Sequence, residues 1–143
     1  MAEVAEEGVL GTEPPVDVDK RAAQFAETID GEGPGAFWVL EDNGRILGFA
    51  AVLARVAGVV SLAMAILPEA RGRGGGRSLV QTAERHARAA GAHKLELEVW
   101  PDNARAIALY ATTGFEVEGL RRNHYRRRDG SLRSALIMAK LLV

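Results

Sequence analysis

The chain has 143 residues, a formal net charge of −1, 48% hydrophobic and 26% charged residues, and no cysteine. This length and composition are typical of a single globular domain with one core. The absence of cysteine excludes disulfides, a thiol nucleophile and a zinc–thiolate centre. The three histidines are scattered and have no metal-ligand spacing.

The beginning of the chain predicts neither export nor membrane insertion. Residues 1–10 are acidic and lack the basic start of a signal peptide. The longest apolar run, residues 56–67, is too short to span a bilayer. We therefore expect a cytoplasmic protein without a membrane partner.

Residues 1–35 form an acidic lead-in that differs from the rest of the chain. They carry nine acids and two bases, whereas residues 71–143 carry seven acids and fourteen bases. Asp19 is placed to cap a short helix over residues 20–29. We expect residues 36–143 to form the folded core, whose basic half would favour an anionic ligand.

Apolar runs bounded by turn residues predict three strands at the start of this core, over residues 36–40, 46–54 and 59–67. An Asn-Gly pair at positions 43–44 is a strong hairpin signal between the first two strands. Gly58 marks the second turn. We therefore expect an antiparallel meander.

The second half of the core alternates between helix and strand. Helical spacing of apolar residues predicts a helix over residues 78–90. Strict alternation of apolar and other residues predicts a strand over residues 94–100. A capped helix follows over about residues 103–113. Two strands joined by an arginine-rich hairpin complete the domain, over residues 115–122 and 134–142.

The most informative segment is Arg71-Gly72-Arg73-Gly74-Gly75-Gly76-Arg77-Ser78, between the third strand and the next helix. Glycines let backbone N–H groups approach a phosphate closely, and a helix N-terminus adds partial positive charge. Arg71 and Arg77 stand where a nucleotide-hydrolase loop needs Gly and Lys, and Arg77 replaces the third glycine of a dinucleotide fingerprint. The spacing instead fits [QR]-x-x-G-x-[GA].

A second motif follows at residues 103–115. It has the pattern N-x-x-A-x-x-x-Y-x-x-x-G-F, formed by Asn103, Ala106, Tyr110, Gly114 and Phe115. With the glycine loop, it resembles the GNAT superfamily of N-acetyltransferases, most closely the RimI-type protein N-terminal alanine acetyltransferases and related amine and amino-acid acetyltransferases. The resemblance covers residues 36–143 and implies a single α/β (α+β) domain with a mixed, mostly antiparallel sheet flanked by helices. The family's first strand and helix would then be missing or reduced to the lead-in.

The resemblance implies that acetyl-CoA is the co-substrate and that no metal takes part. Loop amides would surround the pyrophosphate, and the end of the third strand would pair with the pantetheine arm like an added strand. The coenzyme-binding residues implied are Ala65, Ile66, Leu67, Arg71, Gly72, Arg73, Gly74, Gly75, Gly76, Arg77, Ser78, Asn103, Ala106 and Tyr110.

Two side chains are candidates for acid–base chemistry. By resemblance, Tyr110 points toward the coenzyme sulfur, where a phenol could protonate the departing thiolate; packing against the sheet is its alternative role. Glu98 matches the family's glutamate, twelve residues before the tyrosine, and would deprotonate the amine. An ion pair with an arginine is the alternative role of Glu98, and Glu96 on the same strand face is its obvious substitute.

The predicted acceptor is the α-amine of a peptide N-terminus or an amino acid. Near pH ~7.4, deprotonating a lysine amine costs about 4 kcal/mol, whereas an α-amine costs under about 1 kcal/mol. Two alternatives stay open: a small-molecule amine such as a polyamine or antibiotic, and a non-catalytic acyl-CoA-binding module.

The arginines of residues 121–133 raise the question of a macromolecular partner. Only one aromatic residue, Tyr125, lies among them, which disfavours nucleic acid and favours an acidic acceptor. His124 is a candidate to line the acceptor site. Many relatives dimerise through sheet edges, so a homodimer is compatible with the resemblance, although no segment predicts the interface.

Overall fold

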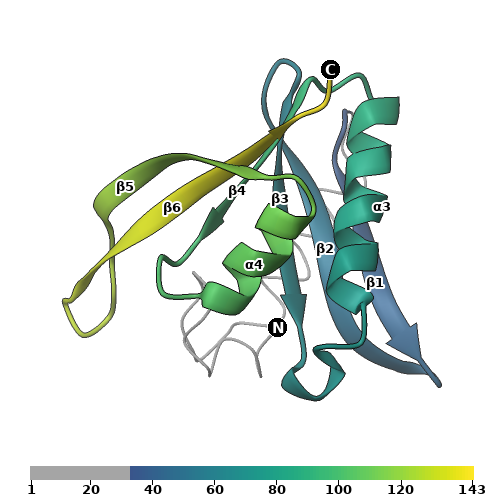
Figure 1. The fold of residues 1–143 in the computed structure, drawn as a ribbon, viewed down its shortest axis with the longest axis horizontal. Helices are drawn as coiled ribbons and strands as arrows, with labels where there is room; N and C mark the ends of the chain where they lie inside the picture. The colour runs from purple at the N-terminus through teal and green to yellow at the C-terminus, as the bar shows by residue number, and fades with distance from the viewer. Residues whose placement is uncertain (1–32) are drawn as a thin grey trace.

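The computed structural model describes residues 33–143, so the helix predicted over residues 20–29 and most of the lead-in lie outside the described residues. The elements in chain order are β1 (Ala36–Asp42), β2 (Arg45–Val56), β3 (Val59–Ile66), a 3₁₀ turn (Pro68–Ala70), α3 (Gly75–Ala89), β4 (Lys94–Val99), α4 (Ala104–Thr112), β5 (Glu116–Arg126) and β6 (Leu132–Leu141). Helices α3 and α4 lie over the same side of a twisted sheet (Figure 1). We call this side the helix face.

The six strands lie in the order β1-β2-β3-β4-β6-β5. β3 and β4 run parallel, whereas the other neighbouring pairs are antiparallel. The last strand, β6, lies between β4 and β5, so Met138 pairs with Leu97 on one side and Val117 on the other. The predicted α/β (α+β) domain, with a mixed, mostly antiparallel sheet flanked by helices, is confirmed.

Two predicted boundaries were wrong by three residues or more, and the others differ by at most two. Helix α3 begins at Gly75, three residues earlier than expected, because Gly74 takes a φ of 84° as its N-cap and the next glycines enter the first turn. Strand β5 extends to Arg126, four residues further than expected. It continues because Tyr125 still pairs with Arg133 of β6.

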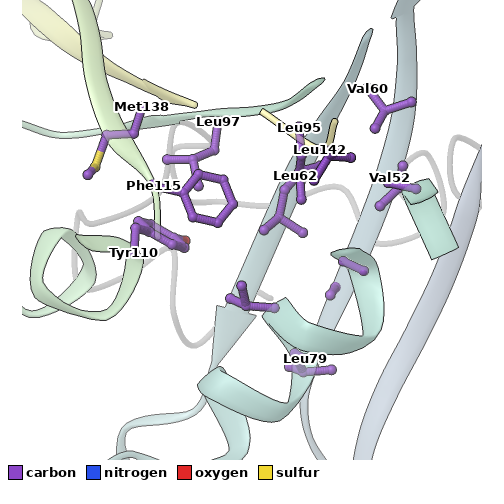
Figure 2. Close-up of a cluster of buried hydrophobic side chains, with 14 of the residues drawn as sticks. Val52, Val60, Leu62, Leu79, Leu95, Leu97, Tyr110, Phe115, Met138 and Leu142 are labelled. Carbon is purple, nitrogen blue, oxygen red and sulfur yellow. The ribbon is translucent and has the colours of Figure 1, made fainter. Parts of the chain in front are cut away.

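The hydrophobic core fills the space between the helix face and the two helices. Leu95 and Leu97 of β4 are almost fully buried, and Figure 2 shows Tyr110 and Phe115 in the same cluster as Leu97 and Met138. Burying a side chain of this size contributes about 1.5–3 kcal/mol. This packing fixes α3 and α4 against the sheet. Within residues 33–143, no helix has both the length and the apolar character needed to cross a membrane.

Candidate active site

Strands β3 and β4 lie side by side only where they begin. Their parallel pairing covers three residue pairs and ends at Ser61 and Glu96, whereas β3 continues to Ile66 and β4 to Val99. The strands therefore separate in the middle of the sheet. The opening exposes the edge of β3 that faces β4.

The hydrogen-bond alternation of β3 determines which backbone groups face this opening. The Leu67 N–H donates to the Leu47 carbonyl at 2.8 Å. In an antiparallel ladder, alternate residues bond to the same neighbour, so the backbone groups of Ala65 point toward β2. Those of Met64 and Ile66 consequently point toward the opening, where an extended ligand could pair with them.

A cavity of about 810 Å³ occupies the opening. Its wall includes every residue of β3 from Ser61 to Ile66, whose side chains alternate between the two faces of the sheet. The cavity therefore connects the helix face with the opposite face. The other lining residues are Phe49, Leu53, Arg55, Ala70, Arg71, Gly72, Gly74, Gly76, Arg77, Glu98, Val99, Trp100, Asn103, Arg105, Ala106, Leu109, Tyr110, Tyr125 and Ala135.

The glycine loop begins α3 at one end of this cavity. Gly72 and Gly74 have φ values of 75° and 84°, a left-handed conformation that glycine adopts without steric cost. No side chain caps the N-terminus of α3. The first backbone N–H groups of a helix have no partner within it and carry partial positive charge. This end of the cavity is therefore suited to a phosphate.

Arg71 holds the loop against the end of β3. Its Nε–H donates to the Ile66 carbonyl at 3.1 Å, and its backbone N–H donates to the Pro68 carbonyl at 3.3 Å. Arg71, the first residue of the motif, thus holds the loop in place through hydrogen bonds inside the protein. The sequence pattern did not indicate this role.

The two glycines that begin α3 lie close to the ends of apolar side chains. A Cβ on Gly75 would lie 2.4 Å from Leu40 Cδ2, and one on Gly76 would lie 3.0 Å from Leu109 Cδ2 and 3.3 Å from Ile66 Cδ1. Such distances force neighbouring atoms to move. The absence of side chains therefore lets the start of α3 approach both β3 and α4.

Tyr110 lies on α4, where the helix face meets the opening. Its side chain is 7% exposed, packs against Phe115 with ring centroids 5.7 Å apart, and lines the cavity. Burial raises the pKa of Tyr110 to about 12. The phenol is therefore protonated at neutral pH and is available as a proton donor.

Glu98 lies on β4, with its side chain on the face opposite the helices. One carboxylate oxygen accepts a hydrogen bond from Arg121 at 2.5 Å, and the other accepts one from the Tyr125 hydroxyl. Both donors come from β5, across β6. A carboxylate has about four lone-pair sites, so Glu98 can still accept a further proton or hydrogen bond.

The Tyr125 hydroxyl is perturbed by the same cluster. Burial, together with the hydrogen bond and the negative charge of Glu98, raises the pKa of Tyr125, while the positive charges of Arg121 and Arg55 act in the opposite direction. Tyr125 therefore stays a donor to Glu98 at neutral pH. The ion pair and the tyrosine together fix the carboxylate at the cavity wall.

Asn103 caps α4. Its Oδ1 accepts a hydrogen bond from the Ala106 N–H at 3.2 Å, which satisfies one of the free donors of the first helical turn. Both residues line the cavity. The cap therefore places the start of α4, and Tyr110 further along it, beside the opening.

The cavity wall includes most of the predicted site residues. These are Ala65, Ile66, Arg71, Gly72, Gly74, Gly76, Arg77, Glu98, Asn103, Ala106 and Tyr110. Four predicted residues lie outside it: Leu67 bonds to β2, Arg73 lies 3.7 Å from Asp42, Gly75 packs toward Leu40, and Ser78 is exposed on α3.

Several lining residues were not predicted from the sequence, among them Arg55, Trp100 and Tyr125. No local motif marks these positions, because the sheet brings them together from β2, the end of β4 and β5. The predicted acceptor-site residue His124 contacts the Tyr125 ring edge-on, with centroids 4.9 Å apart, but is not part of the wall. Among residues 33–143, no group of His, Asp and Glu is arranged to hold a metal ion.

Comparisons with known proteins agree with this geometry. The model of the Acetyltransferase (GNAT) family matches residues 5–115. The [ribosomal protein bS18]-alanine N-acetyltransferase of Escherichia coli is 35% identical over 100 residues, which are 70% of this chain and 67% of the relative. The L-methionine sulfoximine/L-methionine sulfone acetyltransferase of Pseudomonas aeruginosa is 30% identical over 115 residues, 77% of this chain and 66% of that protein.

A solved structure supports the same relationship. The ribosomal-protein-S18-alanine N-acetyltransferase from Escherichia coli superposes with a TM-score of 0.75 at 30% identity, covering 99% of this chain and 85% of that chain. The match of fold, motifs and sequence is therefore consistent along the chain. The protein belongs to the Acetyltransferase (GNAT) family and is an N-acetyltransferase.

Proposed function

We propose that this chain transfers the acetyl group of acetyl-CoA directly to an α-amine, at a peptide N-terminus or on an amino acid, in the cytoplasm. The observation that carries the proposal is the cavity through the sheet, with Tyr110 on the helix side and Glu98 on the opposite side. A donor and an acceptor of the acetyl group could therefore meet in the opening from opposite faces.

The residues of the opening fit the coenzyme. The N–H groups at the start of α3 would bind the pyrophosphate, with Arg71 and Arg77 nearby in the wall. The edge of β3 at Met64 and Ile66 would pair with the amide groups of the pantetheine arm. Bound acetyl-CoA would supply an activated acyl carbon and a thiolate leaving group.

The acid–base steps would be divided between the two faces of the sheet. Glu98 would take a proton from the attacking amine, directly or through water, as the nitrogen forms its bond to the acyl carbon. Tyr110 would give its proton to the sulfur as the carbon–sulfur bond breaks. Since the amine attacks the acyl carbon itself, no protein nucleophile is needed.

Two arguments support an α-amine. A single carboxylate is better matched to an amine of pKa about 7.7–8.0 than to a lysine of about 10.4. Both curated relatives are named for substrates of this type, a ribosomal-protein alanine and amino-acid derivatives. The proposal takes from these relatives the type of amine that is acetylated, but not the identity of the substrate.

The test is a peptide with a free N-terminal alanine and one internal lysine, incubated with acetyl-CoA and analysed by fragmentation mass spectrometry. We expect acetyl only on the α-amine and none on the same peptide with a blocked N-terminus. Modification of the lysine would contradict the choice of an α-amine. Coenzyme binding without transfer to any peptide, amino acid or polyamine would favour a non-catalytic acyl-CoA-binding module instead.

A further inference from the structure

The end of the cavity around Glu98 carries an excess of positive charge. Glu98 is the one carboxylate among the lining residues of the described chain. Arg121 already pairs with Glu98 at 2.5 Å, so the negative charge of the carboxylate is balanced before any ligand binds. A second arginine of this region, Arg55, lines the cavity as well.

Arg55 belongs to the side of the cavity away from the glycine loop. It follows Phe49 and Leu53 along β2, and all three line the cavity. Phe49 and Leu53 pair with Ala65 and Ser61 of β3, the residues of the wall whose side chains point away from the helices. Arg55 therefore lies toward the acceptor end, whereas Arg71 and Arg77 belong to the phosphate end.

Arg55 is exposed, and it makes no ion pair with any of residues 33–143. Its charge nevertheless acts on the Tyr125 hydroxyl, which donates to Glu98. Arg55, Tyr125 and Glu98 also line the same cavity. The acceptor end holds a positive charge that none of the described residues neutralises.

Trp100 provides a second observation at the same end. It lines the cavity, is 5% exposed, and has a buried Nε1–H without a hydrogen-bond partner among the described residues. The Arg133 and Arg127 guanidinium groups lie 4.3 and 5.4 Å from its ring centroid. An unsatisfied buried donor costs about 1–3 kcal/mol. The described residues therefore offer the Trp100 Nε1–H no oxygen acceptor.

We propose that Arg55 is a specificity-determining residue of the acceptor site and binds a carboxylate that the acceptor carries close to its α-amine. A guanidinium presents a fork of donors that matches a carboxylate in two parallel hydrogen bonds. The inference rests on the proposed function, since it names the substrate class of the same site. A polyamine, which carries only positive charge, is excluded as the acceptor.

Two sources can supply this carboxylate: the acidic side chain of a residue next to a peptide N-terminus, or the α-carboxylate of a free amino acid. The test compares kcat/KM for three peptides that differ only at the second residue, as Ala-Glu, Ala-Gln or Ala-Lys. A second arm compares free amino acids with their carboxamides. Preference in the first arm identifies a peptide, and preference in the second an amino acid.

We expect the wild-type protein to prefer the carboxylate over the uncharged partner by about tenfold or more, as for a hydrogen bond to a charged group. Arg55→Gln should reduce this ratio to about one, and Arg55→Glu should reverse it in favour of Ala-Lys. Arg85→Gln, at an exposed position of α3 whose side chain bonds to Thr82, is the matched control and should keep the wild-type ratio. The melting shift with acetyl-CoA verifies that each variant is folded.

Transfer without any carboxylate preference in either arm would overturn this inference and leave the proposed function intact. The same holds if Arg55→Gln keeps the wild-type ratio. No transfer to any α-amine would instead overturn the proposed function, and the inference with it.

Discussion

The two faces of the sheet are built in different ways, although both contribute to one cavity. The helix face is a packed hydrophobic surface on which Tyr110 is 7% exposed. On the opposite face, Glu98 is 33% exposed and is held by an ion pair with Arg121 and by Tyr125. In the proposed function, the first side would hold the coenzyme through shape and backbone groups, and the second would select the acceptor through charged side chains.

The two sides should also differ in how substitutions affect function. Gly75 and Gly76 at the start of α3 lie close to apolar side chains of β1, β3 and α4, and Tyr110 of α4 belongs to the hydrophobic core. The contacts around Glu98 lie at the surface, where substitutions usually cost little stability. We therefore expect variants at the start of α3, beside the opening, to lose coenzyme binding, and variants around Glu98 to lose transfer or selectivity.

The largest effect should come from Glu98→Gln. Loss of a general base typically reduces the rate about 10²–10⁴-fold, and we expect kcat/KM for the peptide acceptor to fall within this range while acetyl-CoA still binds. Steady-state kinetics at saturating acetyl-CoA measures the loss. Glu96→Gln, on the same strand face but outside the cavity wall, is the matched control. Equal rates for Glu98→Gln and wild type would rule out the base role.

A smaller effect should come from Gly76→Val, on the helix face of the sheet. The new side chain would meet Leu109 and Ile66, and such overpacking costs about 1–3 kcal/mol. We expect a weaker affinity for acetyl-CoA, about 5- to 150-fold, measured by isothermal titration calorimetry. Gly119→Val on β5 has no atom within 4 Å of the new Cβ and should bind normally. Unchanged affinity for Gly76→Val would separate the glycine loop from coenzyme binding.

The smallest effect on function should come from Glu84→Gln, which alters the helix face far from the opening. Glu84 accepts hydrogen bonds from Lys140 at 2.7 Å and from Arg88 at 2.9 Å, linking α3 to β6. Burial alone would raise the pKa of Glu84, but these two cations outweigh it and lower the pKa below its ordinary value. We expect a loss of about 1–3 kcal/mol in the free energy of unfolding at pH ~7, with normal kinetics.

The pH dependence of this loss follows from the direction of the shift. A lowered carboxylate pKa stabilises the folded state above the unfolded pKa of about 4.3, and this stabilisation disappears as the pH falls through the folded value. Urea unfolding should therefore show wild type and Glu84→Gln converging below pH ~4. Glu116→Gln, at an exposed position of β5, should match the wild type throughout. A difference that persists in acid would mean that packing, not charge, is responsible.

The helix face was the more predictable side from the sequence. The periodic apolar residues, the Asn103 cap and the glycine spacing are local signals, and each element they predict exists in the structure. The start of α3 was misplaced because glycines have weak helix propensity, whereas in the structure Gly75 and Gly76 form the first turn and lie close to Leu40 and Leu109. Tertiary contacts thus outweighed the low helix propensity of glycine.

The opposite face was largely unpredictable, apart from Glu98. Its carboxylate meets Arg121 and Tyr125, which lie 23 and 27 residues further along the chain. These contacts exist because β6 inserts between β4 and β5, a strand order that no local pattern specifies. Arg55 reaches the cavity from β2, and Trp100 reaches it from the position directly after β4.

The central claim, that the opening between β3 and β4 is the acetyl-CoA site, is tested most directly by the melting temperature with and without saturating acetyl-CoA, with ADP and NAD as controls. Binding linkage at about 100 times Kd contributes about 2.7 kcal/mol, or roughly 5–10 °C for a domain of this size. We predict this shift with acetyl-CoA, a smaller one with ADP and NAD, and a reduced one for Gly76→Val. No shift with acetyl-CoA, or an equal shift with all three compounds, would contradict the claim.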